Sequence, residues 1–133
     1  MFTYNTTIRL HNTDAAGVLF FGDIYDIVNA ALEEYLESIE FSIAYIINES
    51  NFVLPVVHLE ADYKSPLKVG NKISVIVELE KIGSSSLTLT FKFLNKEKKI
   101  MCTAKTVHVA VDKKSWQKIP LPEKLKEALN KDI

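Results

Sequence analysis

Residues 12–37 read N-T-D-A-A-G-V-L-F-F-G-D-I-Y-D-I-V-N-A-A-L-E-E-Y-L-E and place a polar loop directly before a long amphipathic pattern. From residue 24 onward, apolar side chains recur at spacings of three and four residues, and acidic side chains fall mostly between them. The apolar positions are Ile24, Ile27, Val28, Ala31, Leu32, Tyr35 and Leu36. This period predicts one helix of about four turns with a single buried face. Asp23 opens it, where a negative charge favours the positive end of the helix dipole.

The segments on either side of this helix alternate with a period of two, which is typical of half-buried strands. One strand is expected before the loop, from Phe2 to Leu10, and a short helical piece is expected over residues 41–47. Four more strands are expected over 56–63, 73–80, 87–93 and 101–111. In the last of these, Val107, Val109 and Val111 are expected on one face. The prolines at 120 and 122 end the sheet, and P-E-K-L-K-E-A-L predicts a short terminal helix.

Length and composition narrow the class of protein. The 133 residues suit one domain spanning 1–133. The 16 basic residues nearly balance 17 acidic ones, so nothing favours a nucleic-acid partner. The single cysteine, Cys102, excludes an internal disulfide and is expected to be a small buried apolar residue. The chain shows no signal-peptide pattern and no apolar run of membrane-spanning length, so we expect a cytoplasmic protein with no membrane partner.

The element order favours an α+β fold in which a curved antiparallel sheet wraps one long helix. Such a sheet has open edges, and edge-to-edge pairing of two copies would cover one edge on each. We therefore expect a homo-oligomer.

Four stretches resemble a known family when they are taken in order. They are T-D-A-A-G-V-L-F-F (13–21), L-P-V-V-H-L-E-A-D-Y-K-S-P-L-K-V-G-N (54–71), I-G-S-S-S-L-T-L-T-F (82–91) and V-H-V-A-V-D (107–112). The order resembles the hotdog-fold acyl-CoA thioesterases of the 4-hydroxybenzoyl-CoA thioesterase group. The resemblance implies the hotdog fold, with one long central helix wrapped by a five-stranded antiparallel sheet. It also implies a dimer, or a tetramer built from dimers, with each active site at the dimer interface.

Within that group, T-D-A-A-G-V-x-x-F together with P-x-V-H is most similar to the 1,4-dihydroxy-2-naphthoyl-CoA hydrolases of phylloquinone and menaquinone synthesis. The implied reaction cleaves an aromatic acyl-CoA to a free acid and coenzyme A without any cofactor. A broad short- or medium-chain acyl-CoA thioesterase and a non-catalytic acyl-binding hotdog module remain alternatives. A hotdog dehydratase is disfavoured because V-L-F-F lacks the histidine that such enzymes use in this region.

Thioester hydrolysis needs an oxygen nucleophile and a group that stabilises the carbonyl oxygen as it gains charge. By resemblance, Asp14 is the catalytic acid, acting either as nucleophile or as general base for water. Phe21 matches the position whose backbone N–H polarises the thioester carbonyl. Gly17 permits a turn or a close backbone approach that a side chain would block. Taken alone, Asp14 is more typical of an Asx turn or a cap.

The expected acyl pocket lies between the central helix of one subunit and the Asp14 loop of another. Its expected substrate-binding residues are Gly17, Val18, Tyr25, Val57 and His58. His58 is equally typical of a hydrogen-bonded core histidine. His11 is expected in an exposed loop, and His108 on the surface of the sheet.

Coenzyme A binding is expected at the I-G-S-S-S turn, through Ser84, Ser85 and Lys81. Aromatic-substrate members of the family carry basic residues near this turn, and this chain has serines instead. No histidine pair has metal-ligand spacing backed by acids, so no metal is expected.

Overall fold

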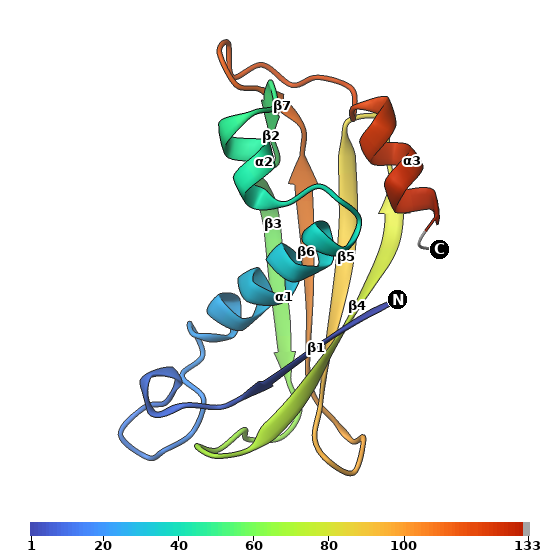
Figure 1. The fold of residues 1–133 in the computed structure, drawn as a ribbon. Helices are drawn as coiled ribbons and strands as arrows, with labels where there is room; N and C mark the ends of the chain where they lie inside the picture. Colours follow the sequence, from blue (N-terminus) through green and yellow to red (C-terminus); the bar gives the residue numbers. More distant parts are fainter. Residues whose placement is uncertain (132–133) are drawn as a thin grey trace.

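The computed structural model describes residues 1–131, in which a long helix crosses the face of a curved sheet (Figure 1). Its helices are α1 (Ile24–Ser38), α2 (Ile43–Asn48) and α3 (Glu123–Lys131), with a 3₁₀ turn η1 (Leu10–Asn12). Its strands are β1 (Phe2–Thr7), β2 (Phe52–Val53), β3 (Val56–Tyr63), β4 (Lys72–Ile82), β5 (Ser86–Leu94), β6 (Ile100–Val109) and β7 (Val111–Asp112).

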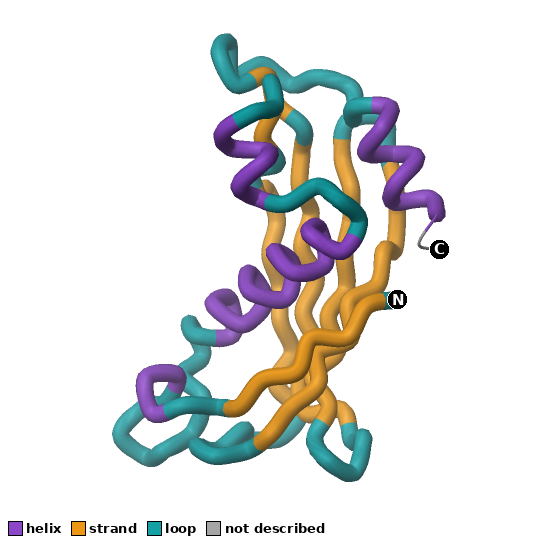
Figure 2. The backbone as a smooth tube through the Cα atoms, in the orientation of Figure 1, coloured by secondary structure: helices purple, strands orange, loops and turns teal. Residues whose placement is uncertain are grey.

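Five of these strands form one antiparallel sheet in the order β1-β4-β5-β6-β3. Helix α1 lies across the inner side of this sheet (Figure 2). The core joins the stripe of α1 to the inward side chains of β4 and β5. It includes Ile24, Ile27, Val28, Ala31, Tyr35, Leu36, Ile73, Val75, Val77, Leu87, Leu89, Phe91 and Phe93. The predicted α+β fold, one long helix wrapped by a five-stranded antiparallel sheet, is confirmed.

Helix α1 has a defined end that turns the chain toward α2. Glu40 adopts a left-handed φ of 69°, and the Phe41 N–H donates to the Leu36 carbonyl over 2.9 Å. Helix α2 then begins at Ser42, whose Oγ accepts from the Tyr45 N–H over 3.1 Å. The predicted short helix between α1 and the strands is therefore confirmed.

The terminal helix α3 lies near β4 and β5, at the end of the sheet that carries the β4–β5 turn (Figure 1). Leu125 and Leu129 are fully buried on its inner side. The Leu121 N–H donates to the Ser84 carbonyl over 2.9 Å and fixes the approach to this helix on the β4–β5 turn. The predicted terminal helix is confirmed.

Three expectations about strands were wrong in detail. Strand β1 ends at Thr7, and Leu10 is 78% exposed in the 3₁₀ turn rather than part of an alternating strand. The expected strand 101–111 breaks at Ala110, whose N–H donates to the Ser85 carbonyl over 2.8 Å. Val111 therefore belongs to β7, which pairs with β2, and does not share a face with Val107 and Val109.

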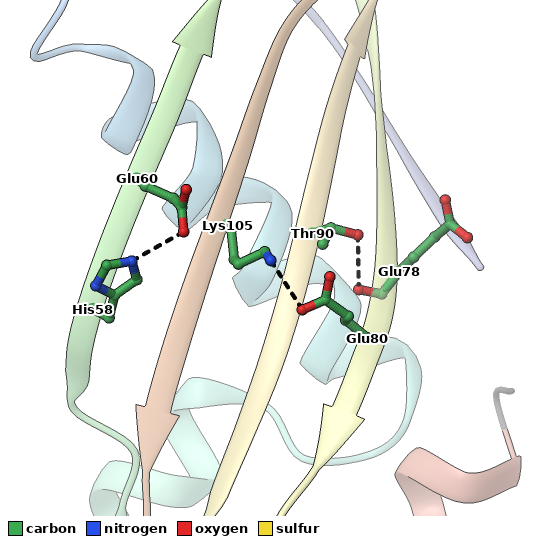
Figure 3. A network of polar contacts seen from close by, with 6 residues as sticks. All are labelled: His58, Glu60, Glu78, Glu80, Thr90 and Lys105. Carbon is green, nitrogen blue, oxygen red and sulfur yellow. Dashed lines mark hydrogen bonds and ion pairs between the residues drawn. The ribbon is translucent and has the colours of Figure 1, made fainter.

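The outer face of the sheet carries charged side chains that pair with one another, within β3 and between β6 and β4 (Figure 3). Lys105 Nζ lies 3.2 Å from Glu80 Oε2, and His58 Nε2 lies 3.0 Å from Glu60 Oε1. These side chains are half-exposed, so each pair contributes little to the free energy of unfolding. The pattern marks the outer face as the solvated side of the sheet.

Strand β3 is an open edge of the sheet, paired only with β6. Val56, Val57 and Tyr63 on this strand are between 48% and 60% exposed. A long edge strand with apolar side chains is a surface that another strand can pair with.

Candidate active site

The residues between β1 and α1 form a narrow loop held by paired backbone hydrogen bonds. The Phe20 N–H donates to the Asn12 carbonyl over 2.8 Å, and the Asp14 N–H donates to the Val18 carbonyl over 2.8 Å. The loop is also fixed from outside, because the Leu19 N–H donates to the Leu67 carbonyl over 2.6 Å. Asp14 thus lies at the tip of a small hairpin whose position is set by the β3–β4 connection.

The Asp14 carboxylate has one engaged oxygen and one free oxygen. Its Oδ1 accepts from the Ala16 N–H over 2.8 Å and from the Val18 N–H over 3.3 Å. Among residues 1–131, no donor lies within hydrogen-bond distance of Oδ2. The Asx-turn geometry and an available carboxylate oxygen therefore coexist in one exposed side chain, and the turn fixes where that oxygen points.

Gly17 allows this turn to close. Its φ of 75° lies in the left-handed region, which side chains other than glycine rarely occupy without strain. Its N–H donates to the Asp14 carbonyl over 3.0 Å, and its carbonyl accepts from the Val69 N–H over 2.9 Å. Gly17 therefore acts through backbone geometry.

Phe21 lies where the loop enters α1, and its two backbone groups differ in their partners. Its carbonyl accepts a hydrogen bond from the Tyr63 hydroxyl. In the described part of the chain, its N–H donates to no group. A free N–H just before a helix adds to the positive end of the helix dipole and can bind a developing negative charge.

Tyr63 and Tyr25 join this site from β3 and α1. Partial burial, with smaller contributions from Cys102 and then Tyr25, raises the pKa of Tyr63 to about 12. The Tyr63 hydroxyl therefore keeps its proton near neutral pH and remains a donor to Phe21. A cavity of about 310 Å³ adjoins this tyrosine. It is lined by Val18, Leu19, Tyr63, Lys64, Ser65, Pro66 and Leu67.

If the chain catalyses the expected thioester hydrolysis, replacing Tyr63 with phenylalanine should lower kcat/KM about tenfold, because the Phe21 turn loses its hydrogen bond to β3. The cost in unfolding free energy should be only about 1 kcal/mol, the usual worth of one hydrogen bond. Steady-state kinetics and urea unfolding measure the two effects. Tyr45→Phe, an exposed tyrosine on α2, is the control. Unchanged kinetics in Tyr63→Phe would mean that this hydrogen bond does not position the site.

Two groups of expected site residues lie away from the Asp14 loop within one chain. Val57 and His58 stand at the start of β3, whereas the loop contacts the end of that strand through Tyr63. His58 points to the outer face, toward Glu60 (Figure 3). The expected coenzyme A residues Ser84, Ser85 and Lys81 lie at the β4–β5 turn, at the opposite end of the sheet (Figure 1).

His108 was expected on the sheet surface, and this was wrong. It is 6% exposed on the inner face of β6. Its Nδ1 lies 3.1 Å from the Leu54 carbonyl and its Nε2 lies 3.0 Å from Thr106 Oγ1. Because a carbonyl only accepts, Nδ1 carries the proton, and Nε2 of the neutral ring accepts from the Thr106 hydroxyl. His11 is exposed and Cys102 is buried, both as expected. Burial raises the pKa of the Cys102 thiol to about 11.

The buried His108 makes stability depend on pH. Burial lowers its pKa below the ordinary value of 6.5, so below that pH the unfolded chain binds a proton that the folded chain does not. As the pH is lowered below 6.5, the free energy of unfolding is therefore expected to fall by up to about 1.4 kcal/mol per pH unit. Urea unfolding at several pH values should show this part of the slope lost in His108→Gln and kept in His11→Gln. Equal slopes in the wild type and His108→Gln would contradict it.

Residues 1–131 contain no group of three or more His, Cys, Asp or Glu side chains placed to hold a metal ion. Within the same range, no helix combines the length and apolar content that a bilayer crossing requires.

Sequence reasoning missed Tyr63 and its neighbour Lys64 as site residues. Tyr63 is 42 residues from Phe21 in the chain, and only the folded sheet brings them together. The available signal was the end of the period-two pattern at Y-K-S-P, which marks where the strand meets a loop.

Comparison with known proteins relates nearly the whole chain to thioesterases. The model of the thioesterase-like superfamily matches residues 8–129. A 1,4-dihydroxy-2-naphthoyl-CoA hydrolase of Nostoc punctiforme is 33% identical over 93% of this chain and 83% of its own length. The hydrolase of that name from Prochlorococcus marinus is 36% identical over 90% of this chain and 81% of its own.

A solved structure extends the likeness to the fold. The crystal structure of a 1,4-dihydroxy-2-naphthoyl-CoA thioesterase from Synechocystis matches with a TM-score of 0.90 at 28% identity, covering 97% of this chain and 95% of the other. The resemblance to hotdog thioesterases, first indicated by residues 13–21, is thereby confirmed. On the family match and these relatives, the chain belongs to the thioesterase-like superfamily.

Proposed function

We propose that the protein hydrolyses 1,4-dihydroxy-2-naphthoyl-CoA to 1,4-dihydroxy-2-naphthoate and coenzyme A, a step of quinone synthesis. The observation that carries the chemistry is the pairing of a free carboxylate oxygen on Asp14 with a free N–H on Phe21. Both belong to one loop, whose shape is fixed by backbone hydrogen bonds. The choice of acyl group rests on relatives of that name at 33% and 36% identity.

Two routes fit Asp14. As a general base, it takes a proton from water while the water oxygen attacks the thioester carbonyl carbon. As a nucleophile, its own oxygen attacks that carbon, and water later hydrolyses the mixed anhydride. In both routes the carbonyl oxygen gains negative charge and is held by the Phe21 N–H. The C–S bond then breaks, and the sulfur leaves as a thiolate that takes up a proton.

The acyl group is proposed to lie against Val18 and Tyr25 of one subunit and against Val57 of another. The expected contact with His58 is not part of this proposal, because His58 points to the outer face of the sheet. Aromatic and branched walls suit a flat ring better than a long flexible chain. Because Val57 and the loop are at opposite ends of β3 within one chain, this pocket requires two copies. Coenzyme A is proposed to meet Ser84, Ser85 and Lys81 at the β4–β5 turn.

We propose a homodimer, or a tetramer of such dimers, formed through the open β3 edge of a single-domain cytoplasmic protein. Light scattering at micromolar concentration is expected to give two or four times the chain mass of 15.1 kDa. Burying the apolar side chains of β3 supplies the driving force. A monomer at that concentration would remove the basis for a shared pocket.

Thiol release separates an enzyme from a non-catalytic acyl-binding module. The protein is mixed with 1,4-dihydroxy-2-naphthoyl-CoA, and free coenzyme A is followed with Ellman-type reagent. We expect many turnovers per active site. Saturable binding of the ester without thiol release would support the module instead.

A further inference from the structure

A hollow of about 680 Å³ lies on the outer face of the sheet, over β1 and β4 and beside the β5–β6 turn. On β4, Ile73 and Val75 are buried in the core, so Ser74 between them faces the opposite, outer side. Leu94 at the end of β5 is in register with Ser74, which brings the β5–β6 turn beside the start of β4. We call this feature the lysine hollow. Its polar lining includes Lys72, Lys96, Lys98, Thr3, Asn5 and Ser74.

The lysine hollow has three positive side chains and no negative one. Among the described residues, no aspartate or glutamate lines it, although Glu97 lies in the adjoining turn. In the same range, none of Lys72, Lys96 and Lys98 lies within ion-pair distance of a carboxylate. The chain as a whole carries a net charge of -1, so this positive charge is a local concentration.

Other lysines on the outer face have their charge matched by glutamates of the same face. Lys92 Nζ lies 3.5 Å from Glu78 Oε1, and Lys105 Nζ lies 3.2 Å from Glu80 Oε2. In the described part of the chain, the lysines of the hollow have no such partner, so their ammonium groups are available to an anion from solution.

The β5–β6 turn holds one of these lysines in an unfavourable backbone conformation. Lys98 has a left-handed φ of 63°, which glycine adopts far more readily than a residue with a Cβ. Asn95 shapes the turn, because its Oδ1 accepts from the N–H groups of Glu97 and Lys99, each over 2.9 Å. Glycine would fit this turn with less strain, so the lysine at this position indicates a role for its ammonium group.

Neutral donors stand beside the lysines. Asn5 and Ser74 are opposite each other on β1 and β4, and the Ser74 hydroxyl donates to Asn5 Oδ1 over 2.7 Å. This bond uses the acceptor of the Asn5 amide, and within residues 1–131 its Nδ2 donates to no group. Ammonium and amide N–H groups donate to phosphate oxygens, whereas a metal cation would require carboxylate oxygens that the described lining lacks.

The lysine hollow is distinct from the residues proposed for coenzyme A. Lys72 and Lys81 stand near the two ends of β4, and nine residue steps along a strand span about 30 Å. Ser74 in the hollow also faces away from α1, which packs on the buried side of β4. A small anion in the hollow is therefore separate from the β4–β5 turn of the same chain.

We propose that the lysine hollow binds a diphosphate group, either inorganic pyrophosphate or the diphosphate of a nucleotide. The proposal goes beyond thioester hydrolysis and does not depend on it. A diphosphate carries about three negative charges near neutral pH and matches the three lysines, whereas a single phosphate carries at most about two. The volume of the hollow falls within the range of small-molecule sites and exceeds what one phosphate fills.

The first measurement is calorimetric titration of the wild-type protein with pyrophosphate at low ionic strength. We expect one site per chain with a Kd below about 1 mM, and weaker binding as sodium chloride is added. Sodium sulfate at the same ionic strength should bind at least about tenfold more weakly. Adenosine diphosphate distinguishes the two sources. Equal or weaker binding assigns the site to inorganic pyrophosphate, and binding at least about tenfold tighter assigns it to a nucleotide.

Lys98 gives the sharpest variant, because glycine suits its left-handed φ. Lys98→Gly should unfold at an equal or higher urea concentration than the wild type, yet bind pyrophosphate at least about tenfold more weakly. Lys98→Arg keeps the charge and should stay within about threefold of the wild-type Kd. Lys72→Gln, on β4, should weaken binding as Lys98→Gly does. Lys124→Gln, which changes an exposed lysine on α3, is the control and should alter neither property.

Pyrophosphate that gives no saturable heat, or that binds no more tightly than sulfate, would overturn the proposal. Wild-type affinity in both Lys98→Gly and Lys72→Gln would do the same. Titration requires no turnover, so its result is independent of the thiol-release assay. A protein that cleaves thioesters without binding pyrophosphate would refute the lysine hollow as a site and leave the proposed function unaffected.

Discussion

Replacing Asp14 with asparagine is expected to lower kcat for thioester hydrolysis by at least about 10²-fold. Asparagine retains an oxygen that can accept from the Ala16 and Val18 N–H groups, so the turn should persist. It cannot attack the thioester as a carboxylate or accept a proton from water. Both routes open to Asp14 therefore fail while the loop keeps its shape.

The matched control is Glu33→Gln, which makes the same change of carboxylate to amide on the exposed side of α1. Both variants should keep the circular dichroism and melting behaviour of the wild type. Only Asp14→Asn should lose turnover. Near wild-type turnover in Asp14→Asn would mean that Asp14 is not the catalytic carboxylate.

Replacing Phe21 with proline is expected to lower kcat by about 10²- to 10³-fold, the usual effect of losing one oxyanion donor. Proline lacks the N–H, and this N–H donates to no group in residues 1–131, so no hydrogen bond of the fold is lost. The carbonyl that accepts from Tyr63 remains. The effect should appear in kcat under saturating substrate.

Phe21→Ala separates the backbone from the side chain. The ring is 71% exposed and packs on Phe20 with centroids 4.6 Å apart, so its removal leaves the core intact. The alanine variant keeps the N–H and should keep kcat within about tenfold of the wild type. If alanine and proline were equally damaging, the ring would be the functional group and the oxyanion role would be wrong.

Much of the fold follows from local patterns. Strand β3 was predicted over 56–63 and lies at Val56–Tyr63, because Pro55 marks its start and Ser65-Pro66 marks its end. Helix α1 follows from one clean apolar stripe. Strand β7 and the surroundings of His108 did not follow, since they depend on contacts with the distant Ser85 and Leu54.

The residues of the candidate site likewise fall into those that the sequence alone could group and those that only the folded chain brings together. Asp14, Gly17 and Phe21 share one loop, so the sequence alone placed them together. Tyr63 enters from another strand, and periodicity carries no information about its partner on Phe21. Val57 stands at the other end of β3 from that loop, and its predicted role depends on a second copy that the pattern of one chain does not contain.

The most direct measurement is the ratio of kcat/KM for 1,4-dihydroxy-2-naphthoyl-CoA to that for hexanoyl-CoA, obtained from thiol release under identical conditions. The proposed aromatic and branched pocket walls predict a ratio of at least about 10² in favour of the naphthoyl ester. Hexanoyl-CoA cleaved as efficiently as the naphthoyl ester would contradict the assignment and leave a broad acyl-CoA thioesterase.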